Sequence, residues 1–480
     1  MKLNLFAAIP EIFMVAMILF ILMVEAFSSD SKKSRVTVLS IITLVITFVL
    51  QVSIYTIGTI QVVFNNMFIL DSMAQGMKLV TYIIGIVTIL YVKQYVHDTK
   101  MLKGEFYIIF LFSIFGMQVM ISANNMLILY VGLELLSLAL YGMVALRREE
   151  VKATEAAMKF FILGALASGL LLYGISFIYG ATGHLELENI FKAMYQSAGL
   201  NSGLMIFGVV FVVAGLVFKL GLVPFHMWVP DVYEGSPMAV VTVIGSVTKI
   251  ASVIFVIRFL IGGLVLLSPQ WTVMLSFLAF LSLFLGNIVA IAQTNIKRLL
   301  GYSTVAHMGF VAFGLMTVSI NGVSAVMFYI VIYAITALAG FGVLTLLSRG
   351  DFECEKISDL KGLSKTHPVY AGIMLLVMLS LAGIPPLAGF YAKFQIIKAL
   401  IASGFIRSAI FAVVMSLIGA FYYLRVIKVM YFEEESSDDI TVSKADTFTR
   451  SVLVFNGLLL IIIGILPATM VKFCTYLITG

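Results

Sequence analysis

The stretch FKLGLVPFHMWVPDVYEGSP, residues 218–237, begins as an apolar helix of the membrane type and then changes character. Lys219 stands inside the apolar run, Pro224 breaks it, and His226 and Asp231 follow closely. A charge at the centre of a membrane span costs roughly 2.5–3.5 kcal/mol on insertion scales. The stretch therefore predicts a discontinuous membrane helix that keeps a charged group beside its break.

The composition identifies the solvent of this chain. Of its 480 residues, 61% are hydrophobic and 11% are charged, whereas a soluble globular protein carries about 25% charged residues. No soluble core could hide so much apolar surface, so we predict an all-α polytopic membrane protein. Two cysteines, Cys354 and Cys474, provide neither a metal site nor a disulfide framework. The net charge of +6 comes without basic-aromatic clusters, so nucleic acid is not an expected partner.

The apolar runs predict the number of membrane crossings. A spanning helix needs about 20 mostly apolar residues, and by that rule the sequence contains about fourteen spans. The seventh and the twelfth look discontinuous. The predicted spans lie at 10–27, 36–55, 73–96, 105–122, 125–146, 155–180, 203–223, 238–263, 271–293, 299–318, 323–347, 369–402, 405–431 and 450–477.

The loops between these spans alternate in lysine and arginine content. The cationic loops carry Lys32, Lys33, Arg35, Lys100, Lys103, Arg147, Arg148, Lys152, Lys297, Arg298, Arg349, Lys356, Lys361 and Lys365. The positive-inside rule places these loops in the cytoplasm. Both termini then face the periplasm, which requires an even number of spans. The charge pattern and the span count therefore agree.

Proline placement predicts an internal repeat. Pro224 breaks the seventh span, and Pro385 and Pro386 break the twelfth. Broken helices at matching places in two halves are typical of inverted repeats whose site lies near the bilayer midplane. We therefore expect one antiporter-like domain over residues 1–480, built on five-helix repeats at 105–263 (spans four to eight) and 271–431 (spans nine to thirteen). The alternative is that the prolines merely kink two helices that face lipid.

Four charged residues lie where charges are costly. Glu134 and Lys249 lie in the middle of their spans, Lys219 lies in the last turn before Pro224, and Lys393 is expected in the first turn after the Pro385–Pro386 break. All the deep cations are lysines, and a lysine can lose its proton in a buried site whereas an arginine cannot. The pattern therefore favours proton loading and unloading over a fixed positive charge.

Glu134 and Lys219 form the first candidate proton-handling pair. A unit charge pair at about 4 Å is worth roughly 4 kcal/mol at an effective dielectric near 20. Movement of the carboxylate could therefore switch the lysine between its charged and neutral forms. The alternative reading is a static buried ion pair that holds two helices together.

Three further groups, His307, His226 and Lys159, are candidate relay residues, and Lys398 is a fourth, weaker case. His307 lies within the span at 299–318, and His226 follows the break after residue 223. Histidine titrates near neutrality, although a lone membrane histidine can also simply bond a neighbouring helix. Lys159 is a weaker candidate and Lys398 weaker still, because both can extend toward the membrane interface.

The sequence also excludes several sources of energy. It contains no glycine-rich phosphate loop, no histidine pair at haem-ligating spacing and no cysteine cluster. We therefore predict neither a redox centre nor an ATPase in this chain, and no metal or cofactor site. If protons move uphill through it, the energy must arrive laterally from another subunit.

Several motifs together resemble a known family, subunit N of proton-pumping NADH:quinone oxidoreductase (respiratory complex I), an antiporter-like membrane subunit. The motifs that carry the resemblance are KLGLVPFHMWVPDVYEGSP at 219–237, SVTKIAS at 246–252, IKRLLGYSTVAHMGF at 296–310 and LAGIPPLAGFYAKF at 381–394. The family often has a second proline shortly after the one matching Pro237. Here Met238 and Ala239 follow instead, which puts the local bend in question but not the charged positions.

The resemblance implies an antiporter-like channel in the bacterial inner membrane that moves protons from cytoplasm to periplasm. In that family Glu134 and Lys219 match the pair of the first half-channel, Lys249 the central lysine, and Lys393 the terminal lysine. Lys159 and His307 match further positions on the axis. The partners implied are the other membrane subunits of complex I. Flavin, iron–sulfur clusters and quinone are expected in other subunits.

Two alternatives remain open from the sequence. One is a subunit of a multisubunit cation/proton antiporter or of a membrane-bound hydrogenase. The other, of a different class, is a membrane scaffold whose buried charges only hold helices together.

Overall fold

The structure, a computed structural model, describes residues 4–27, 34–55, 58–99, 104–196, 203–348, 352–434 and 446–480. Their helices are η1 Leu5–Ala8, α1 Ile9–Ala26, α2 Ser34–Ser53, α3 Ser72–Asp98, α4 Glu105–Ser122, α5 Met126–Val144, α6 Val151–Thr182, α7 Leu187–Gln196, α8 Gly203–Leu220, α9 Trp228–Gly235, α10 Met238–Gly245, α11 Val247–Val256, η3 Ile257–Gly263, η4 Val265–Leu267, α12 Ser268–Ile291, α13 Ile296–Leu315, α14 Ile320–Leu347, η5 Ile357–Leu360, α15 Leu363–Thr366, α16 Pro368–Ala382, α17 Ala388–Ala402, α18 Ile406–Phe432, α19 Thr447–Ile465 and α20 Pro467–Thr479. A small antiparallel hairpin joins β1 Gln61–Val63 to β2 Phe68–Leu70, with Val62 opposite Ile69. The loop cations Lys32, Lys33, Lys100, Lys103 and Arg349 lie outside the described residues.

The predicted all-α membrane architecture is confirmed. Within the described ranges, 12 helices are long and apolar enough to cross a membrane. The two remaining predicted spans, 299–318 and 369–402, also correspond to helices. The first is α13, whose polar residues, among them Thr304 and His307, dilute its apolar character. The second is the pair of half-helices α16 and α17, each too short to cross alone.

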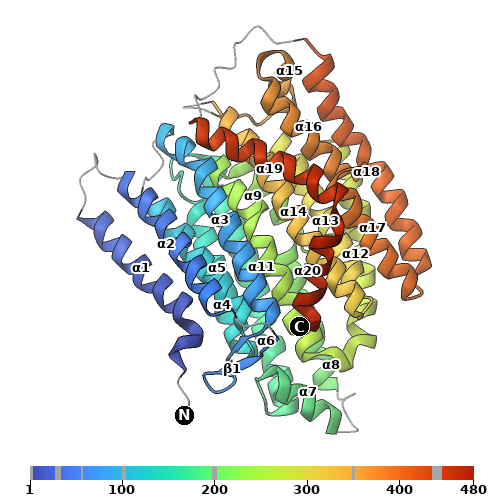
Figure 1. The fold of residues 1–480 in the computed structure, drawn as a ribbon. Helices are drawn as coiled ribbons and strands as arrows, with labels where there is room; N and C mark the ends of the chain where they lie inside the picture. The colour runs from blue at the N-terminus through green and yellow to red at the C-terminus, as the bar shows by residue number, and fades with distance from the viewer. Residues whose placement is uncertain are drawn as a thin grey trace.

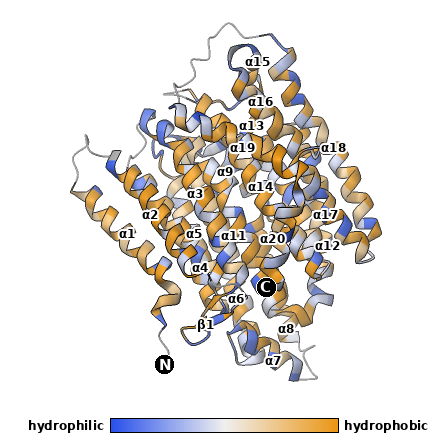
Figure 2. Cartoon of the chain, viewed as in Figure 1, coloured by the Kyte–Doolittle hydropathy of each residue, from blue (hydrophilic) through white to orange (hydrophobic). Residues whose placement is uncertain are grey.

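The ends of the chain lie on one side of the bundle. Figure 1 shows both termini toward the end that carries β1 and α7, with α15 at the opposite end. This arrangement agrees with an even number of crossings. Hydrophobic residues cover most of the length of the helices, and hydrophilic ones gather toward the ends, around α7 and α15 (Figure 2).

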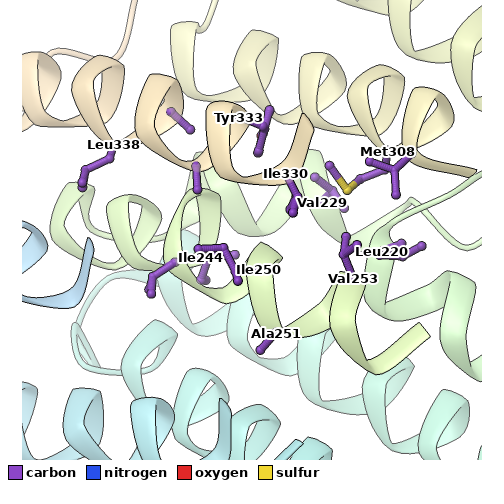
Figure 3. Packing of buried hydrophobic residues seen from close by; sticks show 14 of the residues in the cluster. Leu220, Val229, Ile244, Ile250, Ala251, Val253, Met308, Ile330, Tyr333 and Leu338 are labelled. Carbon is purple, nitrogen blue, oxygen red and sulfur yellow. The ribbon is translucent and has the colours of Figure 1, made fainter. Parts of the chain in front are cut away.

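A central helix organises the packing. The half-helices α10 and α11 are buried along their whole length. Figure 3 shows Ile244, Ile250 and Val253 of this helix packed among apolar side chains of its neighbours. Those neighbours are α8, α9, α13 and α14, which supply Leu220, Val229, Met308 and Ile330. Lys249 therefore lies on the helix that is farthest from lipid.

Two helix pairs pack in the same way. A methyl group added at Gly116 of α4 would lie 2.6 Å from the Leu136 backbone nitrogen of α5. One added at Gly286 of α12 would lie 2.7 Å from the Ala306 backbone nitrogen of α13. The two glycines and their partners are equally spaced in the sequence. This correspondence supports the division into repeats at 105–263 and 271–431, which we propose.

The helix ends near α15 are tied together by a charge cluster around Lys297. The buried Lys297 ammonium lies 2.5 Å from Glu355 and 3.2 Å from Glu353. Glu353 also pairs with Arg147 at 2.6 Å and accepts a hydrogen bond from Tyr95. Burial raises the pKa of the Glu353 carboxyl, but Lys297 and Arg147 outweigh burial and hold that pKa below its ordinary value. The cluster joins α3, α13 and the segments after α5 and α14.

The Glu353 pairs predict a loss of stability in acid. Because the folded-state pKa is lowered, the stabilisation is fully present above the unfolded pKa of about 4.3 and is lost as the pH falls through the lowered value. The thermal unfolding midpoint of the purified protein in detergent should therefore fall more steeply below about pH 4 than that of Glu353→Gln. Glu433→Gln, which alters a half-exposed pair with Lys361, is the control. Parallel pH profiles for wild type and Glu353→Gln would contradict the prediction.

The close approach of α4 and α5 predicts a second effect on stability. Gly116→Ala places a methyl group against the backbone of α5, and overpacking of this kind typically costs about 1–3 kcal/mol. The unfolding midpoint should fall accordingly. Gly372→Ala in α16 is a matched control because nothing lies within 4 Å of its new methyl group. Equal midpoints for the two variants would show that the α4–α5 contact yields easily.

Candidate functional site

The half-helices that precede the two breaks are α8 and α16. Both end in the same backbone motif. After α8, Gly221 adopts φ +82°, and after α16, Gly383 adopts φ +83°. Only glycine takes this left-handed conformation without steric cost. The amides of Gly221 and Leu222 both donate to the Val217 carbonyl.

The second break repeats these bonds. The amides of Gly383 and Ile384 both donate to the Leu379 carbonyl. Pro224 follows the first glycine and Pro386 the second, each after a cis peptide bond. The predicted discontinuities of both spans are confirmed, and each leaves the carbonyl end of a half-helix inside the bundle.

Lys219 lies in the last turn of α8, as predicted. Its side chain is buried, and its ammonium donates to the Ser137 hydroxyl of α5 at 3.0 Å. The negative end of the helix dipole favours a cation at this position. The position therefore combines burial with a helix end that tolerates positive charge.

Lys249 approaches the same helix end from the central helix. Only 1% of the residue is exposed. Its ammonium lies 3.5 Å from the carbonyl of Leu220, the last residue of α8, and 5.3 Å from the centre of the Trp228 ring. A carbonyl and an aromatic face are both neutral partners, so the charge of Lys249 has no carboxylate against it among these contacts.

Lys393 differs from the expectation. It lies in the second turn of α17, not the first, and its ammonium reaches back across the break to the Ala382 carbonyl at 3.0 Å. It also donates to the Ser416 hydroxyl at 2.9 Å and lies 5.4 Å from the Phe310 ring. Four methylene groups give the side chain this reach. The cation therefore meets the negative end of α16 and avoids the positive end of α17.

The hypothesised contact between Glu134 and Lys219 is not an ion pair. Among the described residues, no salt bridge joins them. Glu134 is partly buried and accepts a hydrogen bond from Ser168 of α6. Ser137, which lies one turn after Glu134 on the same helix face, takes the lysine ammonium instead. The carboxylate and the ammonium still interact electrostatically across that turn.

His307 lies in a buried cluster of hydroxyl groups. Its Nδ1 lies 2.6 Å from the Tyr329 hydroxyl, and its Nε2 lies 3.1 Å from the Tyr423 hydroxyl. The Tyr423 hydroxyl is also 2.5 Å from the Ser303 hydroxyl. A small cavity of about 10 Å³ borders His307, Ser380 and Ala392, the residue before Lys393. The histidine and the terminal lysine thus belong to neighbouring parts of one polar region.

The sequence reasoning missed the tyrosines of this region. Thr304, one turn before His307, lies 2.8 Å from the Tyr333 hydroxyl and 3.4 Å from the Tyr233 hydroxyl. Tyr329 and Tyr333 are four residues apart on α14, so both face α13. That spacing was a visible signal for a polar stripe in an apolar span.

The candidate relay residues Lys159 and His226 lie outside this buried line. Lys159 is half-exposed and pairs with Glu155 at 2.8 Å and with Asp231 at 3.0 Å. A cavity of about 860 Å³ opens beside these groups. His226 is partly exposed, and its buried Nδ1 has no hydrogen-bond partner in the described protein. Neither residue is hydrogen-bonded to Lys219, Lys249 or Lys393.

Nothing in the described residues resembles a metal centre, since no group of three or more His, Cys, Asp or Glu side chains could hold an ion. The lysines Lys219, Lys249 and Lys393 are all buried, and no hydrogen bond joins any two of them. Each instead has a hydroxyl or a backbone carbonyl as its nearest partner.

Two membrane helices broken by glycine and proline, with buried lysines at their ends, define an antiporter-like membrane protein. Residues 123–419 match the family model for the transmembrane region of NADH:quinone oxidoreductase and Mrp antiporters. The chain belongs to this family, and within it to the NADH-quinone oxidoreductase subunit N group.

Relatives and solved structures support that placement. The chain is 46% identical to subunit N of Methylovorus glucosotrophus, with 99% of this chain and 98% of the relative covered. It is 48% identical to that of Herminiimonas arsenicoxydans, with 98% of each covered. A chain of respiratory complex I from Thermus thermophilus with bound aureothin has a TM-score of 0.82 at 28% identity, with 96% of this chain and 98% of that chain covered. A chain of the Mrp complex from Dietzia shares the fold, with a TM-score of 0.84 at 18% identity over 99% of this chain and 97% of that one.

The His307 cluster predicts a specific loss of stability. Tyr423→Phe removes the hydroxyl that contacts both His307 and Ser303, and an unsatisfied buried polar group costs about 1–3 kcal/mol. The unfolding midpoint should fall. Tyr431→Phe removes a hydroxyl from the same helix at a half-buried position and should leave it unchanged. A Tyr423→Phe midpoint equal to that of the control would mean that the cluster is not a stable hydrogen-bonded unit.

Proposed function

We propose that this chain is the proton-translocating subunit N of a bacterial respiratory complex I. It carries protons from cytoplasm to periplasm across the inner membrane, with both termini periplasmic. Redox chemistry in other subunits, which hold flavin, iron–sulfur clusters and quinone, supplies the energy through lateral contacts in the membrane. Support comes from two relatives named subunit N, which are 46% and 48% identical to this chain with 98% of each relative covered.

One observation carries the proposal: three buried lysines lie at the ends of half-helices or contact those ends, and their ammonium groups are held by neutral oxygen atoms. A permanent buried ion pair would be satisfied by a carboxylate. Carbonyl and hydroxyl oxygens instead accept a hydrogen bond from a charged lysine and leave a neutral amine tolerable as well. Lysine can exist in both forms at a buried site, so each position suits a proton that comes and goes.

The residues take different roles along the axis. Glu134, partly buried and held by Ser168, sets the field at Lys219, and its approach or withdrawal changes the stability of the charged lysine. Lys249 is the central site on the most buried helix. Lys393, served by Ser416 and close to the His307 cluster, is the terminal site.

The candidate relays Lys159 and His226 belong to the surface end of this route. Lys159 with Asp231 borders a cavity of about 860 Å³, and His226 follows the first helix break. A group that pairs with two carboxylates and remains half-exposed can exchange protons with water. We propose that they supply protons to the buried groups.

The competing scaffold function makes the opposite prediction about the lysines. If Lys219 and Lys393 only hold helices together, their removal should prevent assembly of the complex. If they carry protons, the complex should assemble without pumping. The alternative of a multisubunit cation/proton antiporter predicts sodium-dependent transport without an attached flavin and iron–sulfur arm.

Lysine replacement tests the proposed function directly. Lys219→Met and Lys393→Met, each in the whole complex in sealed vesicles, should assemble and lose most proton pumping driven by NADH oxidation. Lys398→Met removes an exposed lysine five residues further along α17 and should pump normally. Glu134→Gln should weaken pumping, and unchanged pumping would remove Glu134 from the mechanism. Normal pumping in both buried-lysine variants would refute the proposal.

A further inference from the structure

A buried ion pair lies far from the broken helices, in the N-terminal part of the chain. Glu11 in the first turn of α1 pairs with Lys78 of α3. The side chain of Lys78 is 0% exposed and that of Glu11 is 9% exposed. This pair is not part of the proposed proton route through Glu134, Lys219, Lys249 and Lys393.

A second pair connects this region to the central helix. Asp71, the N-cap of α3, binds Arg258 of η3 through both oxygens, at 2.6 and 2.7 Å. The π-helical segment η3 continues the helix that carries Lys249. The start of α3 is therefore held against the end of the most buried helix.

Contacts with α4 bring the two pairs into one region. The Lys78 ammonium lies 4.8 Å from the Phe68 ring, and Phe68 forms a β-bridge with Ala123 just after α4. Arg258 donates from Nε to the Ile121 carbonyl at 3.2 Å. We call Glu11, Lys78, Asp71 and Arg258 the N-terminal charge cluster.

Several buried polar atoms of α1, α3 and α4, the helices that contribute to or contact this cluster, have no partner in the described protein. They are Glu11 Oε2, the Tyr82 hydroxyl, the Ser122 hydroxyl and both polar atoms of the Gln118 amide. Tyr82 lies one turn beyond Lys78 on the same face of α3 and interacts electrostatically with Glu11. Ser122 stands between Ile121, whose carbonyl accepts a hydrogen bond from Arg258, and Ala123, which forms the β-bridge with Phe68.

These unpartnered polar atoms indicate that water is bound in this region. An unsatisfied buried polar group costs about 1–3 kcal/mol, and within a membrane lipid offers no replacement partner. Water bound to several such groups is the usual solution inside proteins. A statically satisfied ion pair would not gather this many unpartnered donors and acceptors around it.

A cavity borders the Asp71–Arg258 side of the cluster. It has a volume of about 290 Å³ and is lined in part by Asp71, Arg258 and Ser319. Leu477 and Ile478 of α20 also line it, so it lies toward the end of the bundle that holds both termini (Figure 1). That end is the periplasmic one in the proposed orientation.

We propose that Glu11 and Lys78 form a hydrated proton-binding site, which the cavity beside Asp71 and Arg258 connects to water on the side of the termini. One proton binds the Glu11 carboxylate and leaves Lys78 charged. Its release to water restores the carboxylate and the ion pair. Arg258 links this site to the helix of Lys249. Proton binding at Glu11 does not depend on the proposed function. A contribution of this site to proton pumping does rest on the proposed function.

Infrared difference spectroscopy tests the proton-binding step. In the intact complex, a change between acidic and neutral pH should produce a protonated-carboxyl band that shifts in Glu11→Asp and disappears in Glu11→Gln. Glu25→Gln, at the other end of α1, should keep that band. A spectrum that neither Glu11 variant alters would overturn the proposal.

Pumping measurements separate a proton site from a structural pair. Glu11→Gln should assemble and lose part of the pumping per NADH oxidised. If it fails to assemble, the double variant Glu11→Gln/Lys78→Met removes both charges at similar volume. A double variant that assembles and pumps normally would overturn the role in pumping, and one that assembles but pumps less would support it. Loss of pumping in Lys219→Met with normal pumping in Glu11→Gln would reject this role alone and leave the proposed function standing.

Discussion

A helix that stops inside a membrane leaves carbonyl groups without partners, and the structure depends on how these are satisfied. Lipid cannot bond them. The left-handed glycines turn two amides back onto one carbonyl at each break, and lysine ammonium groups take the terminal carbonyls of Leu220 and Ala382. The same contact that completes the backbone also gives a buried cation a partner. At each break, one ammonium–carbonyl contact therefore both satisfies the backbone and holds a buried cation.

The two halves reach this result by different routes. In the first, the ammonium comes from Lys249 on the following helix, and in the second it comes from Lys393 on the second half of the same broken helix. The proposed repeats therefore share a backbone motif and the glycine contacts of their paired helices, but differ in the residue that completes the break.

The sequence predicted the spans, the breaks and the buried lysines because lipid leaves a chain few options. A run of apolar residues must be helical there, and a charge within it must face the protein interior. Tyr329, Tyr333 and Tyr423 escaped notice because a tyrosine in an apolar span is equally suited to plain packing. Glu11 escaped because an acid in the first turn of a helix is ordinary. The partner of Lys219 could not be foreseen either, since a one-turn difference decides between Glu134 and Ser137.

The spacing of the lysines has a physical reason. Two ammonium groups about 4 Å apart would repel by roughly 4 kcal/mol at an effective dielectric near 20, so adjacent lysines could not both hold protons. In the described structure no hydrogen bond joins any two of Lys219, Lys249 and Lys393, and each ammonium contacts an oxygen atom of its own. A hydroxyl beside Lys219 and another beside Lys393 can both accept and donate a hydrogen bond. Ser137 and Ser416 therefore give Lys219 and Lys393 neutral partners, so neither contact brings two positive charges together.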